Sequence, residues 1–263
     1  MAAVVVSAAA VEAYTLTWLY PLLRVAGFVM TAPVMGTRTV PARARLVLIL
    51  VLTALIVPLL RAPAAPPDPL TPVGLLTVFQ QLVIGIAIGL VLRMAFLVFE
   101  FAGQVVAQQM GLGFAAMVDP TSGAQVPVLA HLYLILASLI FFASDAHLAL
   151  LRLLFDSFTL LPIGERGFNA AGAEIIVDWS ASLIGAALVL ALPIVIALLA
   201  INLAFGVMAR AAPQLNLLAV GFPVMMLAGV VFASLSLDGF IAQATRVFEG
   251  GWQAVRAALE AAP

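Results

Sequence analysis

The middle of the chain reads FAGQVVAQQMGLGFAAMVDPTSGAQVP over residues 101–127, a stretch that is apolar enough for a membrane but too interrupted for one helix. No charged residue lies between Glu100 and Asp119, while three glycines and the turn-favouring sequence DPTSG break the helical pattern. At membrane depth, backbone that is not helical is tolerated only where protein buries it or where it lines a cavity. We therefore predict that this segment lines or plugs a cavity.

The composition on both sides of this segment is that of a membrane protein. Hydrophobic residues make up 65% of the chain and charged residues 9%, against roughly 45–50% and about 25% in soluble domains. The sequence predicts an all-α polytopic membrane protein of one domain over residues 1–263, built of helical hairpins with about six apolar helices plus amphipathic helices. Four runs without a charged residue, each of 24 residues or more, reach the ~20 residues needed to cross a bilayer: 69–92, 120–144, 179–209 and 211–237.

Breakers and periodicity divide the chain into elements. Apolar helices over 11–31 and 46–60 are predicted to pair as a hairpin, with Arg38, Arg43 and Arg45 at its tip. The remaining elements are a proline-rich connector at 61–72, a long helix at 73–108, a helix at 128–143, a polar segment at 145–178, apolar helices at 179–209 and 217–237, and an amphipathic tail at 238–259.

The distribution of the arginines does not indicate which side of the membrane the loops lie on. If the tip at 38–45 is cytoplasmic, strict alternation also puts Arg210 inside. It leaves five other arginines outside: Arg61, Arg152, Arg166, Arg246 and Arg256. We expect such a chain to fold on a scaffold of partner proteins and not as a simple zigzag in lipid.

The long helix carries two packing features. Gly85 and Gly89 form a GxxxG step that allows another helix to approach closely, within the chain or from outside it. Arg93, Glu100 and Gln104 fall on one helical face. Charged groups in an apolar helix normally face protein or water, so these three form an intrachain polar clasp or contact a neighbouring subunit. A proton relay is disfavoured because arginine does not usefully deprotonate.

The residues that enzymes need do not come together in this sequence. The chain has no Cys and no Lys, which excludes thiol chemistry, a Walker A loop and a Schiff base. His131 and His147 lack the spacing of a metal site, and no carboxylate pairs with a His and a Ser as in a triad. The net charge of -1 provides no basic patch for nucleic acid. We expect no enzyme, no cofactor and no metal.

A polar turn joins the last two apolar helices in the stretch ALPIVIALLAINLAFGVMARAAPQLNLLAVGFPV at 191–224, through Arg210, Pro213, Gln214 and Asn216. Alone, this turn indicates only capping and turn chemistry. Three further blocks precede it in the chain: APVMGTRTVPARARLVL, GLGFAAMVDPTSG and SDAHLALLRLLFDSFTLLPIG. With these four blocks in order, over nearly its whole length, the chain resembles the FliR family of flagellar biosynthesis proteins.

The resemblance implies a subunit of a type III protein export gate in the bacterial inner membrane, at the flagellar basal body. Proteins of this family assemble with FliP and FliQ into a helical gate and work with FlhB and FlhA, inside the MS-ring. Unfolded flagellar proteins pass through the gate. The implied fold is a set of hairpins that resemble FliP and FliQ in their packing, in contact with lipid and not with nucleic acid.

By position, the resemblance also places a pore plug at 110–123. Phe114, Met117 and Val118 become an apolar seal, because an apolar constriction closes a pore by dewetting. Its remaining members are Met110 at the start, Gly111 and Gly113 as flexible points, and Asp119, Pro120 and Gly123 at the closing turn.

Three alternatives stay open on the sequence alone. The injectisome homologue of the same gate shares this architecture. A secondary transporter for a small solute would also contain broken helices, although the two halves show no paired breaks in matching positions. An inert assembly scaffold would need neither a plug nor a substrate site.

Overall fold

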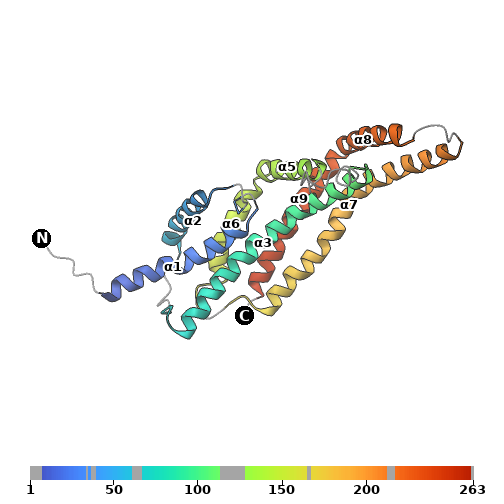
Figure 1. Cartoon of the computed structure of the whole chain (residues 1–263). Helices are drawn as coiled ribbons and strands as arrows, with labels where there is room; N and C mark the ends of the chain where they lie inside the picture. Colours follow the sequence, from blue (N-terminus) through green and yellow to red (C-terminus); the bar gives the residue numbers. More distant parts are fainter. Residues whose placement is uncertain are drawn as a thin grey trace. The chain divides into compact units, whose positions relative to one another are not determined.

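The computed structural model describes residues 8–33, 35–36, 40–60, 67–112, 128–164, 167–211 and 217–261. Within these residues every regular element is helical, as predicted (Figure 1). The helices are α1 (Ala8–Thr31), α2 (Ala42–Ile56), the 3-10 helix η1 (Val57–Leu59), α3 (Pro72–Gln109), α5 (Val128–Ala143), α6 (Ala146–Leu160), α7 (Ala170–Ala211), α8 (Leu217–Leu235) and α9 (Leu237–Glu260).

Three helical segments are long and apolar enough to cross a membrane: α2 with η1, then α3, then α7. Two further pairs, α5 with α6 and α8 with α9, qualify only if each bent pair counts as one span. The described residues therefore contain three to five possible spans. The six apolar helices that the sequence predicted correspond to α1, α2, α3, α5, α7 and α8. Not every one of them is a span by itself, since α5, for example, has only 16 residues.

Two helix starts differ from the sequence prediction. Arg43 and Arg45 belong to the beginning of α2 and not to a hairpin tip, because Pro41 takes the N-cap position, with φ of -56° and a non-helical ψ of 142°, and the helix begins at the next residue. Helix α7 begins at Ala170 and includes Glu174 and Asp178, which the prediction assigned to a separate polar segment.

Asn169 explains the early start of α7. Its side-chain Oδ1 accepts a hydrogen bond of 2.8 Å from the backbone N–H of Gly172, which is the usual action of an N-cap residue. Its Nδ2 donates a hydrogen bond of 3.0 Å to the carbonyl oxygen of Ala261, just after α9. One asparagine thus satisfies backbone groups at the start of one helix and at the end of another.

The chain separates into two compact units. Unit 1 contains Met1–Met94, His147–Ser180 and Gly250–Pro263, and unit 2 contains Ala95–Ala146 and Ala181–Glu249. Helices α3, α7 and α9 contribute residues to both units.

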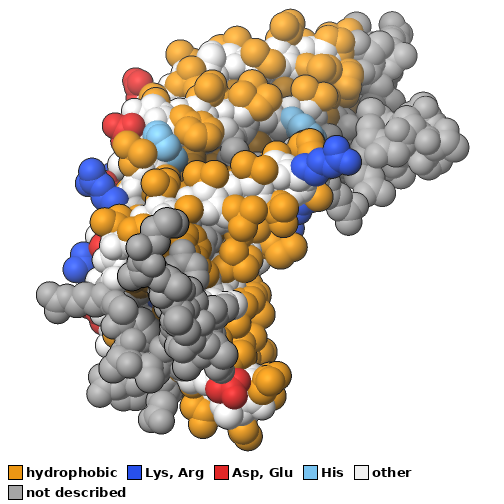
Figure 2. Space-filling view, turned by 90° about the vertical axis from the view of Figure 1, so that its left-hand side faces the viewer, with side chains coloured by type: hydrophobic (Ala, Val, Ile, Leu, Met, Phe, Trp, Pro, Cys, Tyr) orange, Lys and Arg blue, Asp and Glu red, His pale blue; other side chains and the backbone are white. Residues whose placement is uncertain are grey.

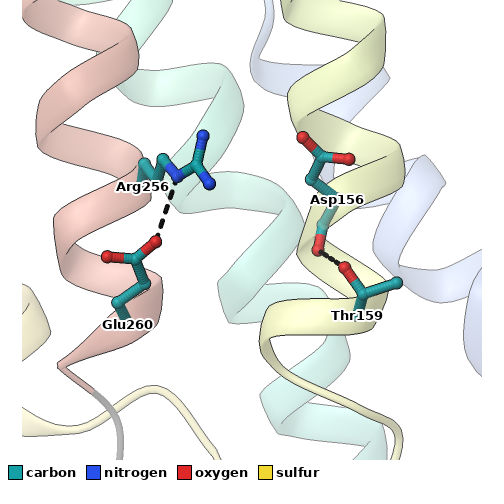
Figure 3. A network of polar contacts seen from close by, with 4 residues as sticks. All are labelled: Asp156, Thr159, Arg256 and Glu260. Atoms are coloured by element: carbon teal, nitrogen blue, oxygen red, sulfur yellow. Dashed lines mark hydrogen bonds and ion pairs between the residues drawn. The ribbon is translucent and has the colours of Figure 1, made fainter.

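The polar groups at the end of α9 and in α6, both in unit 1, make local contacts within their own helices (Figure 3). Arg256 Nε lies 3.0 Å from Glu260 Oε1 in an i,i+4 ion pair, with both side chains more than half exposed. The Thr159 hydroxyl donates a hydrogen bond of 2.7 Å to the carbonyl oxygen of Asp156. Such exposed contacts stabilise a helix by only ~0.3–0.5 kcal/mol.

Aromatic side chains form the core of unit 2. Phe248 of α9 packs against Phe96 and Phe99 of α3 and against Phe141 of α5, with ring centroids 5.3 to 5.8 Å apart. Phe240 continues this cluster toward the start of α9 and contacts Phe99 at 5.3 Å and Tyr133 at 5.2 Å. Rings at these separations and tilts add roughly 0.5–1.5 kcal/mol per pair beyond area burial.

Candidate functional site

The predicted plug begins where the described part of α3 ends. The structure describes Met110, Gly111 and Leu112 of this segment. The other predicted plug residues lie outside the described residues: Gly113, Phe114, Met117, Val118, Asp119, Pro120 and Gly123.

Gly111 terminates α3 in a left-handed conformation with φ of 82°. Its N–H donates to the carbonyl oxygen of Gln108 at 3.0 Å, and the N–H of Leu112 donates to the carbonyl oxygen of Ala107 at 3.1 Å. These two bonds form a Schellman motif with Gly111 at the position after the C-cap, where a residue without a Cβ is favoured.

Met110 anchors the same point to a second helix. Its side chain is buried, and its Cγ and Cε atoms lie 2.6 Å from the position that a Cβ on Gly229 of α8 would occupy. Met110 is therefore a packed core residue of unit 2. The thioether fills the space that the missing side chain of Gly229 leaves.

Gly103, two turns earlier in α3, lies against the start of α5. A Cβ on Gly103 would lie 2.6 Å from the Cα of Ala130 and 3.1 Å from the carbonyl oxygen of Leu129. The end of α3 is thus in contact with α5 through Gly103 and with α8 through Met110. These contacts make a fixed base at the point where the predicted plug segment leaves α3.

Gly85 and Gly89 lie against α1 within unit 1. A Cβ on Gly85 would overlap the carbonyl oxygen of Arg24, and one on Gly89 would lie 2.7 Å from the carbonyl oxygen of Phe28. Gly27 of α1 makes the reciprocal approach, since its Cβ would lie 2.7 Å from the carbonyl oxygen of Leu82. The structure thus places the GxxxG step at a close contact inside the chain.

Arg93, Glu100 and Gln104 do not form a polar clasp in the described part of the chain. Arg93 is exposed, and Glu100 and Gln104 are half-buried. None of the three makes a hydrogen bond or an ion pair with another described residue. Arg93 therefore leaves a charged group on the surface of a helix whose other exposed side chains include Ile86 and Leu97.

The polar turn between α7 and α8 is only partly described. Arg210 is exposed in the last turn of α7, where its charge complements the negative end of the helix. Pro213, Gln214 and Asn216 lie outside the described residues.

Sequence reasoning missed the role of Arg24 of α1, which is 0% exposed and is the most deeply buried charged side chain among the described residues. Its Nε donates to Gln81 Oε1 at 2.8 Å, and its Nη1 and Nη2 donate to the carbonyl oxygens of Ser157 at 2.7 Å and Leu161 at 2.9 Å. The guanidinium carbon also lies 4.2 Å from the ring centroid of Phe158. The signal in the sequence was a single charge within an apolar helix.

Arg24 binds the C-terminal end of α6. Ser157 lies in the last turn of that helix and Leu161 directly follows it, so the two carbonyl groups belong to the negative end of the helix dipole. No carboxylate among the described residues pairs with Arg24. The helix terminus and the aromatic face therefore take the place of a counter-ion, and α1, α3 and α6 are held together around one guanidinium.

An apolar cavity of about 260 Å³ lies within unit 2. Its walls come from α5, α7, α8 and α9 and include Leu129, Tyr133, Leu190, Val230 and Phe240. The two serines on its wall, Ser234 of α8 and Ser236 directly after α8, each donate their hydroxyl to a carbonyl oxygen of α8. This lining suits apolar groups and lacks the convergent polar groups that would orient a polar solute.

Metal-ligating side chains do not gather in the described residues. No group of three or more His, Cys, Asp or Glu side chains there is arranged to hold a metal ion. His131 is exposed on α5, and His147 is half-buried on α6.

Hydrophobic side chains cover most of the described surface visible in Figure 2, and charged side chains are few and separated. One such area is at the end of α7, where no residue between 199 and 211 is buried. Gly206 of α7 and Gly221 of α8 have open space where a Cβ would point. The surface of these two helices is thus apolar, with open space beside Gly206 and Gly221.

Comparison with known proteins gives a consistent result. A family model described as bacterial export proteins, family 1, matches residues 15–251 of the chain. The chain is similar to the flagellar biosynthetic protein FliR of Escherichia coli (strain K12), with 39% identity over 219 residues that cover 82% of this chain and 83% of that protein. It is also similar to FliR of Pectobacterium carotovorum subsp. carotovorum, at 37% over 83% of each chain, and to FliR of Bacillus subtilis (strain 168), at 27% over 88% of this chain and 90% of that one.

Proposed function

Because the chain belongs to family 1 of the bacterial export proteins, we propose that it is a subunit of the flagellar type III protein export gate. In this role it lies in the bacterial inner membrane at the flagellar basal body and contributes to flagellum assembly. The similarity to flagellar biosynthetic proteins named FliR, over more than four fifths of both chains, carries this proposal.

The exposed end of α7 supports a place in a complex. No residue between 199 and 211 is buried by the described part of the chain, although Ile201, Phe205 and Ala209 are half-buried along one side of the helix. Hydrocarbon alone does not require the open glycines Gly206 and Gly221, whereas glycine lets a second helix approach closely. We assign this surface to FliP and FliQ, with which the chain forms the pore.

Arg93, Glu100 and Gln104 complete the set of subunit contacts. A lipid-facing arginine near the middle of a helix would cost ~2.5–3.5 kcal/mol, so Arg93 faces a partner that supplies an acceptor. We assign the same role of subunit contact to the α7–α8 turn, with Arg210, Pro213, Gln214 and Asn216. Gly85 and Gly89 pack against α1 within the chain, so we do not count them among the subunit contacts.

FlhB, FlhA and the MS-ring are the further partners of the assembled gate, and unfolded flagellar proteins are its cargo. The plug of this pore is the segment 110–123. Phe114, Met117 and Val118 form the seal, and Gly113, Asp119, Pro120 and Gly123 give the loop its bends. Gly103 and Met110 make the contacts with α5 and α8 that form the fixed base described above, and Gly111 ends α3 there, so the seal moves relative to α5 and α8.

Purification tests the subunit proposal. The chain is produced with an affinity tag from its own chromosomal locus, and the detergent extract is analysed by mass spectrometry and by size. A large complex that contains FliP and FliQ is expected. Extraction of the chain alone, or as a small symmetric oligomer, would contradict the proposal and would favour a self-contained transporter.

Deletion of residues 112–123 tests the plug. The assembled complex should become permeable to small ions or dyes, because the apolar constriction is lost. The matched control replaces the same residues by a Gly/Ser linker of equal length with Phe and Met kept at 114 and 117, which should restore the barrier. If the deleted form assembles and its permeability is unchanged, the plug is elsewhere.

A further inference from the structure

The cavity of about 260 Å³ in unit 2 lies at the bend between α8 and α9, where the helix axis turns by 60°. The Ser236 hydroxyl at this bend donates a hydrogen bond of 2.8 Å to the carbonyl oxygen of Phe232, and such back-bonding often bends helices. Residues on both sides of the bend line the cavity: Val230, Ala233 and Ser234 before it, and Ser236, Leu237 and Phe240 from it onward. The cavity therefore forms where one helix ends and the next leaves in another direction.

The cavity has a packed floor and an open apolar rim. Helix α5 and Leu190 of α7 provide the wall opposite the bend, and all of the lining residues belong to unit 2. Four lining side chains are only 4% to 8% exposed: Leu129, Tyr133, Leu190 and Phe240. Three others are 41% to 59% exposed: Leu132, Val230 and Leu237. A molecule that enters across this rim passes only hydrocarbon side chains before it reaches the floor.

Water is a poor occupant of this space. A buried water molecule needs two to four polar partners. Of the lining residues, three carry a hydroxyl group, and the hydroxyls of Ser234 and Ser236 already donate to carbonyl oxygens of α8. None of the lining residues is charged. The walls therefore favour an apolar occupant.

The third hydroxyl group, that of Tyr133, indicates that the occupant also carries a polar atom. Tyr133 is buried, and its ring packs edge-on to Phe240 with the centroids 5.2 Å apart. Its hydroxyl makes no hydrogen bond with another described residue, although the hydroxyl of a buried tyrosine usually finds a partner. The cavity that Tyr133 lines is the space from which an acceptor outside the chain can reach it.

The volume distinguishes a chain-like ligand from a single side chain of another protein. A cavity of about 150 Å³ is large enough for one benzene molecule, so one phenyl ring would leave a large part of 260 Å³ empty. Empty apolar space is unfavourable because the wall atoms lose their contacts. A flexible hydrocarbon chain can follow an irregular cavity and fill it.

We propose that this cavity is a binding site for one acyl chain of a membrane phospholipid, whose ester carbonyl oxygen accepts a hydrogen bond from the Tyr133 hydroxyl. The acyl chain supplies the apolar body that the walls favour, and the ester supplies the single acceptor. The lipid in this site is a bound ligand with defined contacts, in contrast to the lipids that surround any membrane protein. This proposal is independent of the export function.

The site can be tested with phosphatidylethanolamine that carries a photoreactive diazirine on one acyl chain. This lipid is added in small molar excess to the whole detergent-extracted protein, with whatever partners co-purify, and the labelled peptides are identified by mass spectrometry after illumination. Labelling should concentrate on residues 129–136 and 230–240, which line the cavity. Equal labelling of the apolar surface at 199–211 would mean an adventitious coat only and would overturn the proposal.

Filling the cavity should exclude the lipid. Ala233→Phe puts a ring into the space and should lower the labelling of these two segments at least fivefold, and Ser234→Leu is a second filling variant in case the first does not fold. Ala242→Phe, at an exposed position of α9 that does not line the cavity, is the matched control and should stay within twofold of the natural protein. Thermal unfolding establishes which variants are folded. Unchanged labelling in a folded filling variant would contradict the site.

The hydrogen bond is tested by Tyr133→Phe, which keeps the ring and removes the hydroxyl. The amount of phospholipid that stays bound through purification should fall about two- to tenfold, the range expected for the loss of one net hydrogen bond. Unchanged retention would show that the Tyr133 hydroxyl does not bind the ester. Photo-crosslinks from a diazirine amino acid at position 237 provide the last arm. Crosslinks to lipid support the proposal, whereas crosslinks to a partner protein or to residues 113–127 would show that protein fills the cavity.

Discussion

The side chain of Met110 occupies the space that a side chain on Gly229 would need, with its Cγ 2.6 Å from that Cβ position. Gly229→Ala should therefore destabilise unit 2 by about 1–3 kcal/mol through overpacking. The measurement is the thermal unfolding of the purified protein in detergent.

A double-mutant cycle tests whether this contact is the cause. Met110→Ala alone should cost about 2–5 kcal/mol because it leaves a cavity. In the Met110→Ala background, Gly229→Ala should then be close to neutral, since its methyl group enters that cavity. Additive losses would show that Met110 and Gly229 are not in contact.

Gly111→Ala should weaken the end of α3. A residue with a Cβ in the left-handed conformation costs about 1–2 kcal/mol, and the φ of Gly111 is 82°. Gly111→Asn, which tolerates this conformation better, should lose less. Protease cleavage close to residue 112 should be faster in Gly111→Ala than in Gly111→Asn, and equal cleavage would argue against the motif.

Replacement of Arg24 should unfold the contact between α1, α3 and α6. Arg24→Met leaves three buried acceptors without their donor. A hydrogen bond to a charged group contributes ~1.5–3 kcal/mol. The free energy of unfolding should therefore fall several times more than it does for a surface substitution. Arg24→Lys should be intermediate, because an ammonium group cannot reproduce the planar fork. Motility of complementing cells and thermal stability of the extracted protein are both measured.

Arg256→Met is the control for that series, since Arg256 is 64% exposed and makes only an i,i+4 ion pair with Glu260. Its loss should be about 0.3–0.5 kcal/mol. If Arg24→Met and Arg256→Met have the same effect, the guanidinium of Arg24 does not hold α6.

Gly206→Leu separates folding from assembly. Gly206 has open space around its Cβ position, so a larger side chain should leave the isolated chain folded and even raise helix stability. If a partner helix lies there, the yield of the co-purified complex should fall at least tenfold. Leu203→Ala, a nearby change to a smaller side chain, should leave the yield within twofold. An unchanged yield for Gly206→Leu would assign this face to lipid.

The charges that flank α2 predict its direction across the membrane, although the arginines of the whole chain do not favour one side. Three arginines, Arg38, Arg43 and Arg45, lie at or before its start and one, Arg61, lies after η1, so the positive-inside rule puts the start in the cytoplasm. A membrane-impermeant maleimide should label Ala42→Cys only in inverted vesicles and Leu70→Cys only in right-side-out vesicles. The reverse pattern would contradict this orientation.

The helices with strong apolar patterns could be predicted from the sequence almost to the residue. The long helix expected at 73–108 is Pro72–Gln109, and the one expected at 128–143 is Val128–Ala143. Proline-rich and polar segments on both sides mark such boundaries, because they cannot continue an apolar helix.

Helix starts that contain charged residues were placed wrongly. The charges of Glu174 and Asp178 suggested a separate segment, yet the Asn169 cap begins a helix that continues through them. The N-cap residue is a local sequence signal that could have predicted this helix start, but the charged residues were given more weight. The same applies to Arg43 and Arg45, where Pro41 marked the start of α2.

Side-chain partners could not be read from the chain alone. Arg24 binds groups 57, 133 and 137 residues away in sequence, and such long-range contacts depend on tertiary packing. The spacing of Gly85 and Gly89 indicated a close helix contact. Its partner, α1, emerged only from the fold.

The length of α7 limits how this protein can exist in a cell. Its 42 residues extend about 63 Å, roughly twice the thickness of bilayer hydrocarbon. A bilayer can cover only about half of a helix of this length, and tilting of the helix accommodates only part of the difference between its length and the hydrocarbon thickness. Over residues 199–211 no residue is buried by the described part of this chain, so we expect other chains to cover the remaining apolar surface there. Synthesis in excess of those chains should therefore give a protein that quality-control proteases remove, so its abundance should follow that of the scarcest companion.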